Sequence, residues 1–233
     1  MNALSLSIIL PVLDESAGIE ATLAVLAPYR ERGAELIVVD GGSRDDTRLR
    51  ARPLADCVLA AERGRAAQMN AGRTVARGDV LLFLHADTCL PDGADILILE
   101  GLAHSGRVWG RFDVRFDRRG LLSLIAFMMN LRSRLTGIAT GDQAFFVTRA
   151  AFDSVGGFPS IALMEDVALS VQLKRVSRPL CIRARVTTSA RRWQKHGTFR
   201  TIFLMWRLRL AYFFGADPAQ LARRYGYASV KQQ

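Results

Sequence analysis

Acidic side chains occur at four points of the chain where an apolar run ends or a helical pattern begins. They are Glu15, Asp40, Asp87 and the adjacent pair Glu165 and Asp166. The run before Asp87, Val80–Leu84, is short and apolar, which is typical of a strand buried on both faces of a parallel sheet. Open α/β sheets bind ligands at the carboxyl ends of their strands, so we expect the first three carboxylates to share one edge.

This edge carries groups that suit a nucleoside diphosphate. Asp40 could accept hydrogen bonds from a base. Asp87 could hold a divalent cation on the phosphates, because Mg²⁺ is usually bound by one or two carboxylates together with phosphate oxygens. Arg65, which follows Gly64, and the N–H groups at helix starts could add phosphate contacts.

Each signal also has a plainer explanation. Asp40 and Asp87 could be ordinary turn residues. The pair Glu165 and Asp166 could only complement a helix dipole. Arg191-Arg192-Trp193 could be a solvated loop with one anchored aromatic ring. The order and spacing of these residues, taken together, favour the functional interpretation.

The composition predicts a globular protein with an anionic partner. The 233 residues are 50% hydrophobic and 23% charged, and the net charge is +10. Residues 1–100 carry 10 basic and 15 acidic side chains, whereas residues 101–233 carry 22 and 7. Nearly all the cations are arginines, which suits planar recognition of phosphate or carboxylate.

The three cysteines are isolated and odd in number, so they predict neither a metal site nor a disulfide framework. The apolar start of the chain lacks a basic flank, and no stretch reaches the ~20 apolar residues of a membrane span. We therefore expect a cytoplasmic protein.

Apolar runs and helical patterns alternate in the first half, which predicts a parallel, doubly wound sheet. The expected strands are Ser5–Leu10, Glu35–Val39, Cys57–Ala60 and Val80–Leu84, with Pro11 ending the first. The expected helices are 17–32, 65–77 and 92–105. A further helix is expected to open at a capping box of Ser43 and Asp46.

The second half predicts a smaller mixed or antiparallel part followed by helices. Residues 108–117 alternate apolar and polar side chains, which is typical of a strand with one polar face. The further strands are 144–147 and 180–186, and the further helices are 121–135, 164–176, 198–214 and 218–225. We expect one domain, 1–233, with a nucleotide-binding half (1–104), an acceptor and catalytic half (105–195) and a helical extension (196–233).

Six segments, in this order, resemble glycosyltransferase family 2, whose fold is of the GT-A type. They are Leu10–Glu15, Val38–Thr47, Gly64–Gly72, Leu84–Asp87, Gly156–Phe158 and Glu165–Leu169. The segments Arg63–Gly72 and Met164–Val167 look most like the bacterial radical-SAM/selenodomain-associated transferases. The resemblance implies an inverting glycosyltransferase that moves a sugar from a nucleoside-diphosphate donor, a UDP- or GDP-sugar, to a hydroxyl acceptor.

The resemblance also implies roles for these residues. Asp87 and the preceding Ala86 match the end of the Asp-x-Asp motif, which binds Mn²⁺ or Mg²⁺ on the donor diphosphate, and Asp166 matches the general base, with Glu165 beside it. The nucleotide pocket would be lined by Pro11, Glu15, Asp40, Gly64 and Arg65. The leaving diphosphate would be stabilised by Arg191, Arg192 and Trp193.

The chain departs from the family pattern at three places. His85 replaces the first Asp of Asp-x-Asp, so the metal site is thinner, although His85 could itself be a ligand or support one. Asp14 stands where Asn is common. Ser189 and Ala190 replace the Gln end of the last motif, which argues against processive polymer synthesis.

Gly141, Asp142 and Gln143 could line the acceptor site, or could form only a turn. Two other function classes stay open: a nucleotidyltransferase on a similar sheet, and a non-catalytic basic binding module. The stretch Pro11–Glu15 stands where a nucleotidyltransferase usually has a Gly-rich basic loop, which argues against the first. Basic and aromatic residues do not interleave as a stacking platform, so we expect no nucleic-acid partner.

The helices at 121–131 and 202–214 are apolar with arginines at their edges: Arg118, Arg119, Arg132, Arg134, Arg207 and Arg209. Core or homodimer packing is the favoured explanation. The sharper alternative is peripheral binding to an anionic membrane at its inner face, which would present a lipid-linked acceptor.

Overall fold

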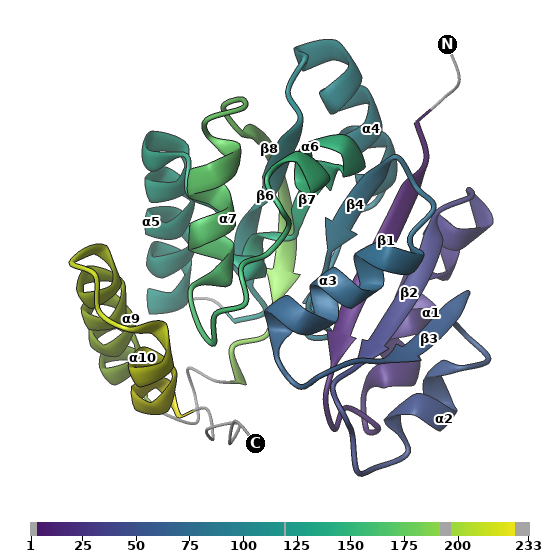
Figure 1. The fold of residues 1–233 in the computed structure, drawn as a ribbon, viewed down its shortest axis with the longest axis horizontal. Helices are drawn as coiled ribbons and strands as arrows, with labels where there is room; N and C mark the ends of the chain where they lie inside the picture. The colour runs from purple at the N-terminus through teal and green to yellow at the C-terminus, as the bar shows by residue number, and fades with distance from the viewer. Residues whose placement is uncertain (1–3, 119, 192–196, 227–233) are drawn as a thin grey trace.

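A computed structural model describes residues 4–118, 120–191 and 197–226 of the chain. Its centre is a curled eight-stranded sheet in the order β3-β2-β1-β4-β7-β6-β8-β5, with helices on both faces (Figure 1). The strands are β1 (Leu6–Val12), β2 (Glu35–Asp40), β3 (Cys57–Ala60), β4 (Val80–Phe83), β5 (Thr88–Cys89), β6 (Trp109–Phe116), β7 (Phe145–Thr148) and β8 (Leu180–Thr188). The helices are α1 (Ile19–Glu31), α2 (Thr47–Ala51), α3 (Arg65–Val75), α4 (Ala94–Ser105), α5 (Leu121–Thr136), the 3₁₀ turn η1 (Gly141–Gln143), α6 (Arg149–Ser154), α7 (Glu165–Leu173), α9 (Thr198–Phe213) and α10 (Pro218–Tyr225).

Strands β1 to β4 form the parallel part that the alternating pattern predicts. β1 lies between β2 and β4, and β3 extends the sheet beyond β2, with every pair parallel. In this register Val12 lies opposite Asp40, and Ile9 lies opposite Phe83. The carboxyl ends of β1, β2 and β4 therefore meet at one edge of the sheet.

Pro11 does not end the first strand, as the sequence had suggested. It continues β1 and lies opposite Val39 of β2. Alternate residues of a parallel strand direct their backbone groups to opposite neighbours, and Ile9 already accepts the last bond from the β4 side, from Leu84 N–H. Pro11 lacks an N–H group, but that group would face the side beyond the end of β4, so no hydrogen bond between strands is lost.

Strand β6 does not show a solvent-facing polar side, which corrects a second expectation. Arg111 and Asp113 are buried, because α5 covers this part of the strand. Asp113 accepts hydrogen bonds from Arg111 and, at 2.6 Å, from Arg134 Nη2 of α5. Asn130, also on α5, binds the N–H and C=O of Val114 like a neighbouring strand. Arg111 and Asp113 therefore face a helix instead of water, whereas Arg115 of the same strand is exposed.

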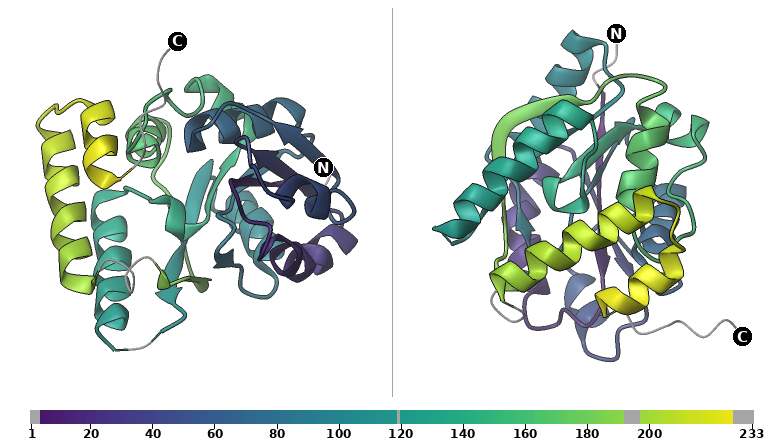
Figure 2. Two further views of the ribbon diagram at one scale, coloured as in Figure 1. Left: turned by 90° about the horizontal axis from the view of Figure 1, so that it is seen from below. Right: turned by 90° about the vertical axis from the view of Figure 1, so that its left-hand side faces the viewer.

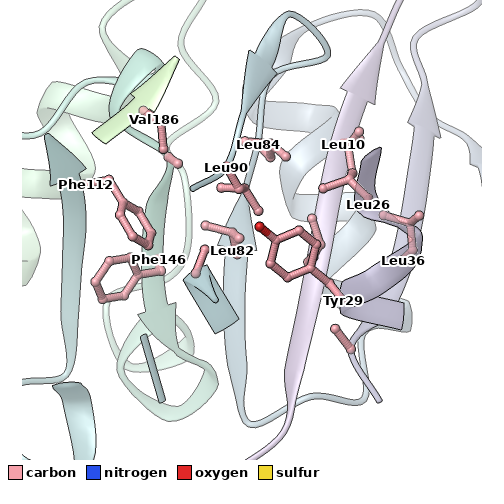
Figure 3. Close-up of a cluster of buried hydrophobic side chains, with 14 of the residues drawn as sticks. Leu10, Leu26, Tyr29, Leu36, Leu82, Leu84, Leu90, Phe112, Phe146 and Val186 are labelled. Atoms are coloured by element: carbon pink, nitrogen blue, oxygen red, sulfur yellow. The ribbon is translucent and has the colours of Figure 1, made fainter. Parts of the chain in front are cut away.

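Two apolar clusters hold the helices against the sheet. Side chains of α1 and α4 pack on one face with residues from β1, β4, β6 and β7, among them the side chains in Figure 3. α3, α6 and α7 pack on the other face. α3 lies so close to β1 that a Cβ at Gly72 would be 2.4 Å from Ile9 Cγ2, so this crossing requires glycine.

Helices α5 and α9 expose most of their large apolar side chains. Figure 2 shows α9 and α10 at one end of the molecule, beside α5. The core-packing explanation is therefore wrong for these side chains, which are 38% to 82% exposed: Leu121, Leu124, Phe127, Met128, Leu131 and Leu135 of α5, and Phe203, Trp206, Leu210, Phe213 and Phe214 in and after α9. Among the described helices, none has the length and apolar character required to cross a membrane.

Candidate active site

The loops after β1 and β2 are joined by hydrogen bonds from backbone to side chains. Asp14 N–H donates to Ser43 Oγ at 2.8 Å, and Arg44 N–H donates to Asp14 Oδ1 at 2.8 Å. Glu15 N–H donates to Thr47 Oγ1 at 2.8 Å. Asp14 therefore has a structural role that the sequence did not indicate, and it holds Glu15 at the sheet edge.

Asp40 caps the turn that follows β2. Its carboxylate is 1% exposed and accepts from Gly42 N–H and Ser43 N–H, each at 3.1 Å, and from the Ser43 hydroxyl. The expected capping box at α2 is absent, because Ser43 Oγ binds Asp40 and Asp46 makes no side-chain cap. The turn interpretation of Asp40 is thus confirmed, and a contact with a nucleobase stays a prediction.

Two amides of α3 brace this edge from behind. Gln68 is buried, and its Nε2 donates to Val12 O at 2.9 Å and to Val39 O at 2.8 Å. Asn70 binds both backbone groups of Phe158, at 2.8 and 3.0 Å. These side chains are not a solvated helix face. The position of Gln68 among the apolar residues of α3 was the feature of the sequence that could have indicated a buried, hydrogen-bonding amide.

Asp87 lies exposed at the end of β4, where the sequence placed it. The Thr88 hydroxyl lies 3.5 Å from the Asp87 carboxylate and makes only a weak contact with it. Burial raises the pKa of Glu15, the charge of Arg191 opposes this shift, and the charge of Asp87 adds to it. Arg191 and Asp87 therefore both lie within electrostatic reach of Glu15, and Arg191, which is distant in sequence, lies beside this edge of the sheet.

His85 turns away from Asp87 and towards the 3₁₀ turn η1. Its Nδ1 is 3.4 Å from Asp142 Oδ1, and a Cβ at Gly141 would lie 2.5 Å from the ring. Partial burial of Asp142 acts to raise the pKa of its carboxyl, but the bond to His85 and the charges of His85, Arg65 and Arg209 lower it to about 2. Asp142 is therefore an anion that orients the His85 ring.

Asp166 is fixed at the start of α7 by two backbone N–H groups. Its Oδ2 accepts from Gly141 N–H at 2.9 Å, and its Oδ1 accepts from Val167 N–H at 2.7 Å. Glu165 is buried beside it, and this burial, together with the charge of Asp166, raises the pKa of Glu165 to about 7. A path of contacts thus runs from His85 through the 3₁₀ turn to Asp166.

Backbone strain gathers at the same places. Asp14, Ala144 and Met164 have positive φ angles, of 53°, 47° and 70°, and they are the non-glycine residues of the described chain that do so. Each lies next to a candidate site residue, in the β1 loop, after η1 or before α7. Left-handed conformations at non-glycine residues cost free energy and cluster at functional sites.

A family model described as glycosyl transferase family 2 matches residues 7–156. The chain belongs to this family. The match covers β1 to α6 and therefore the whole edge with Glu15, Asp40 and Asp87. No protein with a curated description matches the chain significantly.

Solved glycosyltransferase structures share the fold, which is of the GT-A type. Staphylococcus aureus TarS 1–349 in complex with UDP-GlcNAc superposes with a TM-score of 0.66 at 18% identity, over 79% of this chain and 58% of that one. The Pyrobaculum calidifontis mannosyltransferase PcManGT, in complex with GDP-Man and Mn²⁺, superposes with a TM-score of 0.64 at 21% identity, over 96% of this chain and 65% of that one. Glucosyl-3-phosphoglycerate synthase from Mycobacterium tuberculosis, in complex with Mn²⁺, UDP and glucosyl-3-phosphoglycerate, superposes with a TM-score of 0.59 at 19% identity, over 79% of this chain and 71% of that one. The chain spans only 36% of TarS in a longer structure.

A metal site of the kind that the resemblance to Asp-x-Asp implies would have few protein ligands in this chain. Among the described residues, no three His, Cys, Asp or Glu side chains gather as potential ligands. Asp87 nevertheless suits a cation whose other ligands are phosphate oxygens, because its carboxylate is exposed and Glu15 adds negative charge nearby. Gln143 is buried in a capping box with Thr140, and Arg192 and Trp193 lie outside the described residues.

Glu165→Gln should remove a pH dependence of stability. The pKa of Glu165 in the folded state lies above its ordinary value of 4.5, so the wild-type free energy of unfolding should fall as pH rises from about 4.5 to about 7. The glutamine variant should lack this fall and exceed the wild type at pH 8 by up to about 3 kcal/mol.

Urea denaturation at pH 5 and pH 8 measures this difference. Glu62→Gln is the matched control, because Glu62 is an exposed glutamate whose change should leave the pH profile as it is. Parallel profiles for the wild type and Glu165→Gln would contradict the assignment.

Proposed function

We propose that this protein is an inverting, metal-dependent glycosyltransferase that moves a sugar from a nucleoside-diphosphate sugar to a hydroxyl acceptor. The observation that carries the proposal is the contact path from the end of β4, through His85, Asp142 and Gly141, to the carboxylate of Asp166. This path connects the edge of the sheet at Asp87, which suits a diphosphate, with Asp166, which would act as the base. Family membership supports it over a nucleotidyltransferase or a non-catalytic module.

The donor would lie across the carboxyl ends of β1, β2 and β4. Asp40 and Glu15, with Pro11, would line the base pocket, while Gly64, Arg65 and Ala86 would border the nucleotide. Asp87 would hold Mn²⁺ or Mg²⁺, which neutralises charge that develops on the diphosphate as the glycosidic bond breaks. Arg191 adds positive charge on this side, and Arg192 and Trp193 follow it in the chain.

Asp166 would act on the acceptor. As a general base it removes the proton from the attacking hydroxyl, while the hydroxyl oxygen bonds to the anomeric carbon from the face opposite the leaving diphosphate. One direct attack inverts the configuration of that carbon. Gly141 fixes the carboxylate, and the strained Met164 sets the start of α7.

The donor class follows from the related folds, which bind UDP-GlcNAc, UDP and GDP-Man, two of them with Mn²⁺. We therefore propose a UDP- or GDP-sugar. The halves 1–104 and 105–195 would bind the donor and the acceptor. The assignment to the radical-SAM/selenodomain-associated subfamily rests on the segments Arg63–Gly72 and Met164–Val167.

Thermal shift with a panel of UDP- and GDP-sugars, with and without Mn²⁺, tests the proposal. A ligand that binds the folded state raises its melting temperature in proportion to occupancy and affinity. We expect at least one donor to stabilise the protein, and to do so more strongly with Mn²⁺. The absence of any shift across the panel would contradict nucleotide-sugar transfer.

The exposed apolar surface of α5 and α9 supports peripheral membrane binding. Exposed arginines, Arg118 and Arg207, flank it, which suits anionic lipid, whereas Arg134 pairs with Asp113 and does not face outward as a free charge. Vesicles of anionic lipid should bind the protein at low salt, and zwitterionic vesicles should bind it less. If the protein instead forms a concentration-dependent dimer and binds neither kind of vesicle, this apolar surface would be an interface with a second copy of the chain.

A further inference from the structure

Two arginines on different helices are partly buried without partners. Nε and Nη2 of Arg132, on α5, and Nε of Arg209, on α9, are enclosed, and nothing in the described part of the chain accepts a hydrogen bond from them. Neither guanidinium forms an ion pair with a described carboxylate. Burying a cation without a counter-charge costs several kcal/mol. A protein can retain this cost when a bound ligand supplies the missing negative charge.

The surrounding charges make this imbalance larger. Burial, together with the positive charges of Arg209 and Arg111, lowers the pKa of Arg132 to about 10, and the charge of Asp166 opposes this shift. The nearby acid Asp113 is already engaged by Arg111 and Arg134. The two arginines therefore repel each other, and no described carboxylate forms an ion pair with either of them.

Arg132 and Arg209 lie on the acceptor side of the proposed site. Asp166 acts electrostatically on Arg132, and Arg209 acts on Asp142. Burial, followed by the charge of Asp166, raises the pKa of Tyr212 on α9, so this helix lies near the start of α7, as Figures 1 and 2 also show. The donor side has its own arginine, Arg191, next to Glu15.

We propose that Arg132 and Arg209 bind a phosphate group of the acceptor and hold its hydroxyl against Asp166. The inference rests on the proposed function for the role of Asp166. Guanidinium groups match phosphate oxygens in planar pairs of hydrogen bonds. Arg132 and Arg209 are each only partly buried, so part of each side chain stays open to a ligand. The protein would thus glycosylate phosphorylated acceptors, whether soluble or lipid-borne.

Calorimetric titration with inorganic phosphate at low salt tests the site. We expect Arg132→Met and Arg209→Gln each to weaken phosphate binding by about 10- to 100-fold, as for loss of a charged hydrogen bond. Arg207→Gln, which removes an exposed arginine from the same helix, should match the wild type. Equal phosphate affinity in all four proteins would overturn the proposal.

Two further measurements separate the alternatives. Arg132→Met should raise the melting temperature without phosphate, because it removes an unpaired buried charge. A lower melting temperature with unchanged phosphate affinity would make Arg132 structural and overturn the proposal. Phosphate should bind equally well when UDP and Mn²⁺ are present. Competition would assign the arginines to the donor diphosphate and overturn the acceptor role.

A failure of the proposed function would look different. If neither UDP nor GDP bound to the wild type, the donor assignment would fall and with it the identification of the phosphate as part of an acceptor. The phosphate titration of the arginine variants would still decide whether these side chains bind an anion.

Discussion

Asp166→Asn should lower the rate of donor turnover by roughly 10²- to 10⁴-fold, the range typical for loss of a general base. Asparagine keeps the shape of the side chain and an oxygen that can accept from Gly141 N–H, so η1 and the start of α7 should stay in place. It cannot take a proton from an attacking hydroxyl. Nucleotide affinity should be unchanged if Asp166 acts on the acceptor, as we propose.

The acceptor need not be known for this measurement. Release of UDP or GDP by hydrolysis of the stabilising donor reports the same attack, with water as the acceptor. Asp92→Asn is the control, since Asp92 is an exposed aspartate in the turn before α4. Turnover by Asp166→Asn within a fewfold of the wild type would remove the general-base role.

Asp87→Asn should abolish the part of nucleotide affinity that depends on the metal. The change removes the carboxylate charge but keeps the shape, and the weak contact with Thr88 means that the fold should not respond. With Mn²⁺ we expect the Kd for UDP or GDP to rise by at least about 10-fold, judging from losses of 10- to 100-fold when even the supporting partners of metal ligands are removed. Without metal the two proteins should bind the nucleotide alike.

The sparse site also predicts an order of binding. With Asp87 as the main protein ligand, Mn²⁺ should bind the nucleotide-free protein weakly and the nucleotide complex tightly, because phosphate oxygens complete the coordination. Titration of Mn²⁺ with and without UDP measures both affinities. Tight binding to the nucleotide-free protein would point to ligands beyond Asp87.

Local patterns predicted the donor half well. The short apolar runs before Asp40 and Asp87 could pack only as buried strands, and the intervening helices required parallel crossovers. The strand ends, and hence the shared edge, followed from this pairing. Pro11 was wrongly taken as a strand end, because its effect depends on where the neighbouring strand stops.

The acceptor half was harder to predict, because its polar residues are satisfied by partners that are distant in sequence. The alternating pattern of β6 suggested a face in water, but α5 supplies Asn130 and Arg134 to that face. Gln68 likewise resembled a solvated side chain until α3 was placed against β1 and β2. Periodicity records which residues share a face but does not show what covers it.

The sequence by itself determined the family, the parallel core and the three carboxylates at its edge, because each depends on a short segment and its immediate neighbours. Only the tertiary structure decided what surrounds those carboxylates. In the folded chain His85 faces Asp142, and Gly141 N–H donates to Asp166. Arg132 and Arg209 have buried nitrogen atoms for which no described group accepts a hydrogen bond. Charges act through space, so the electrostatics of the acceptor side are set by packing between helices that no local pattern connects.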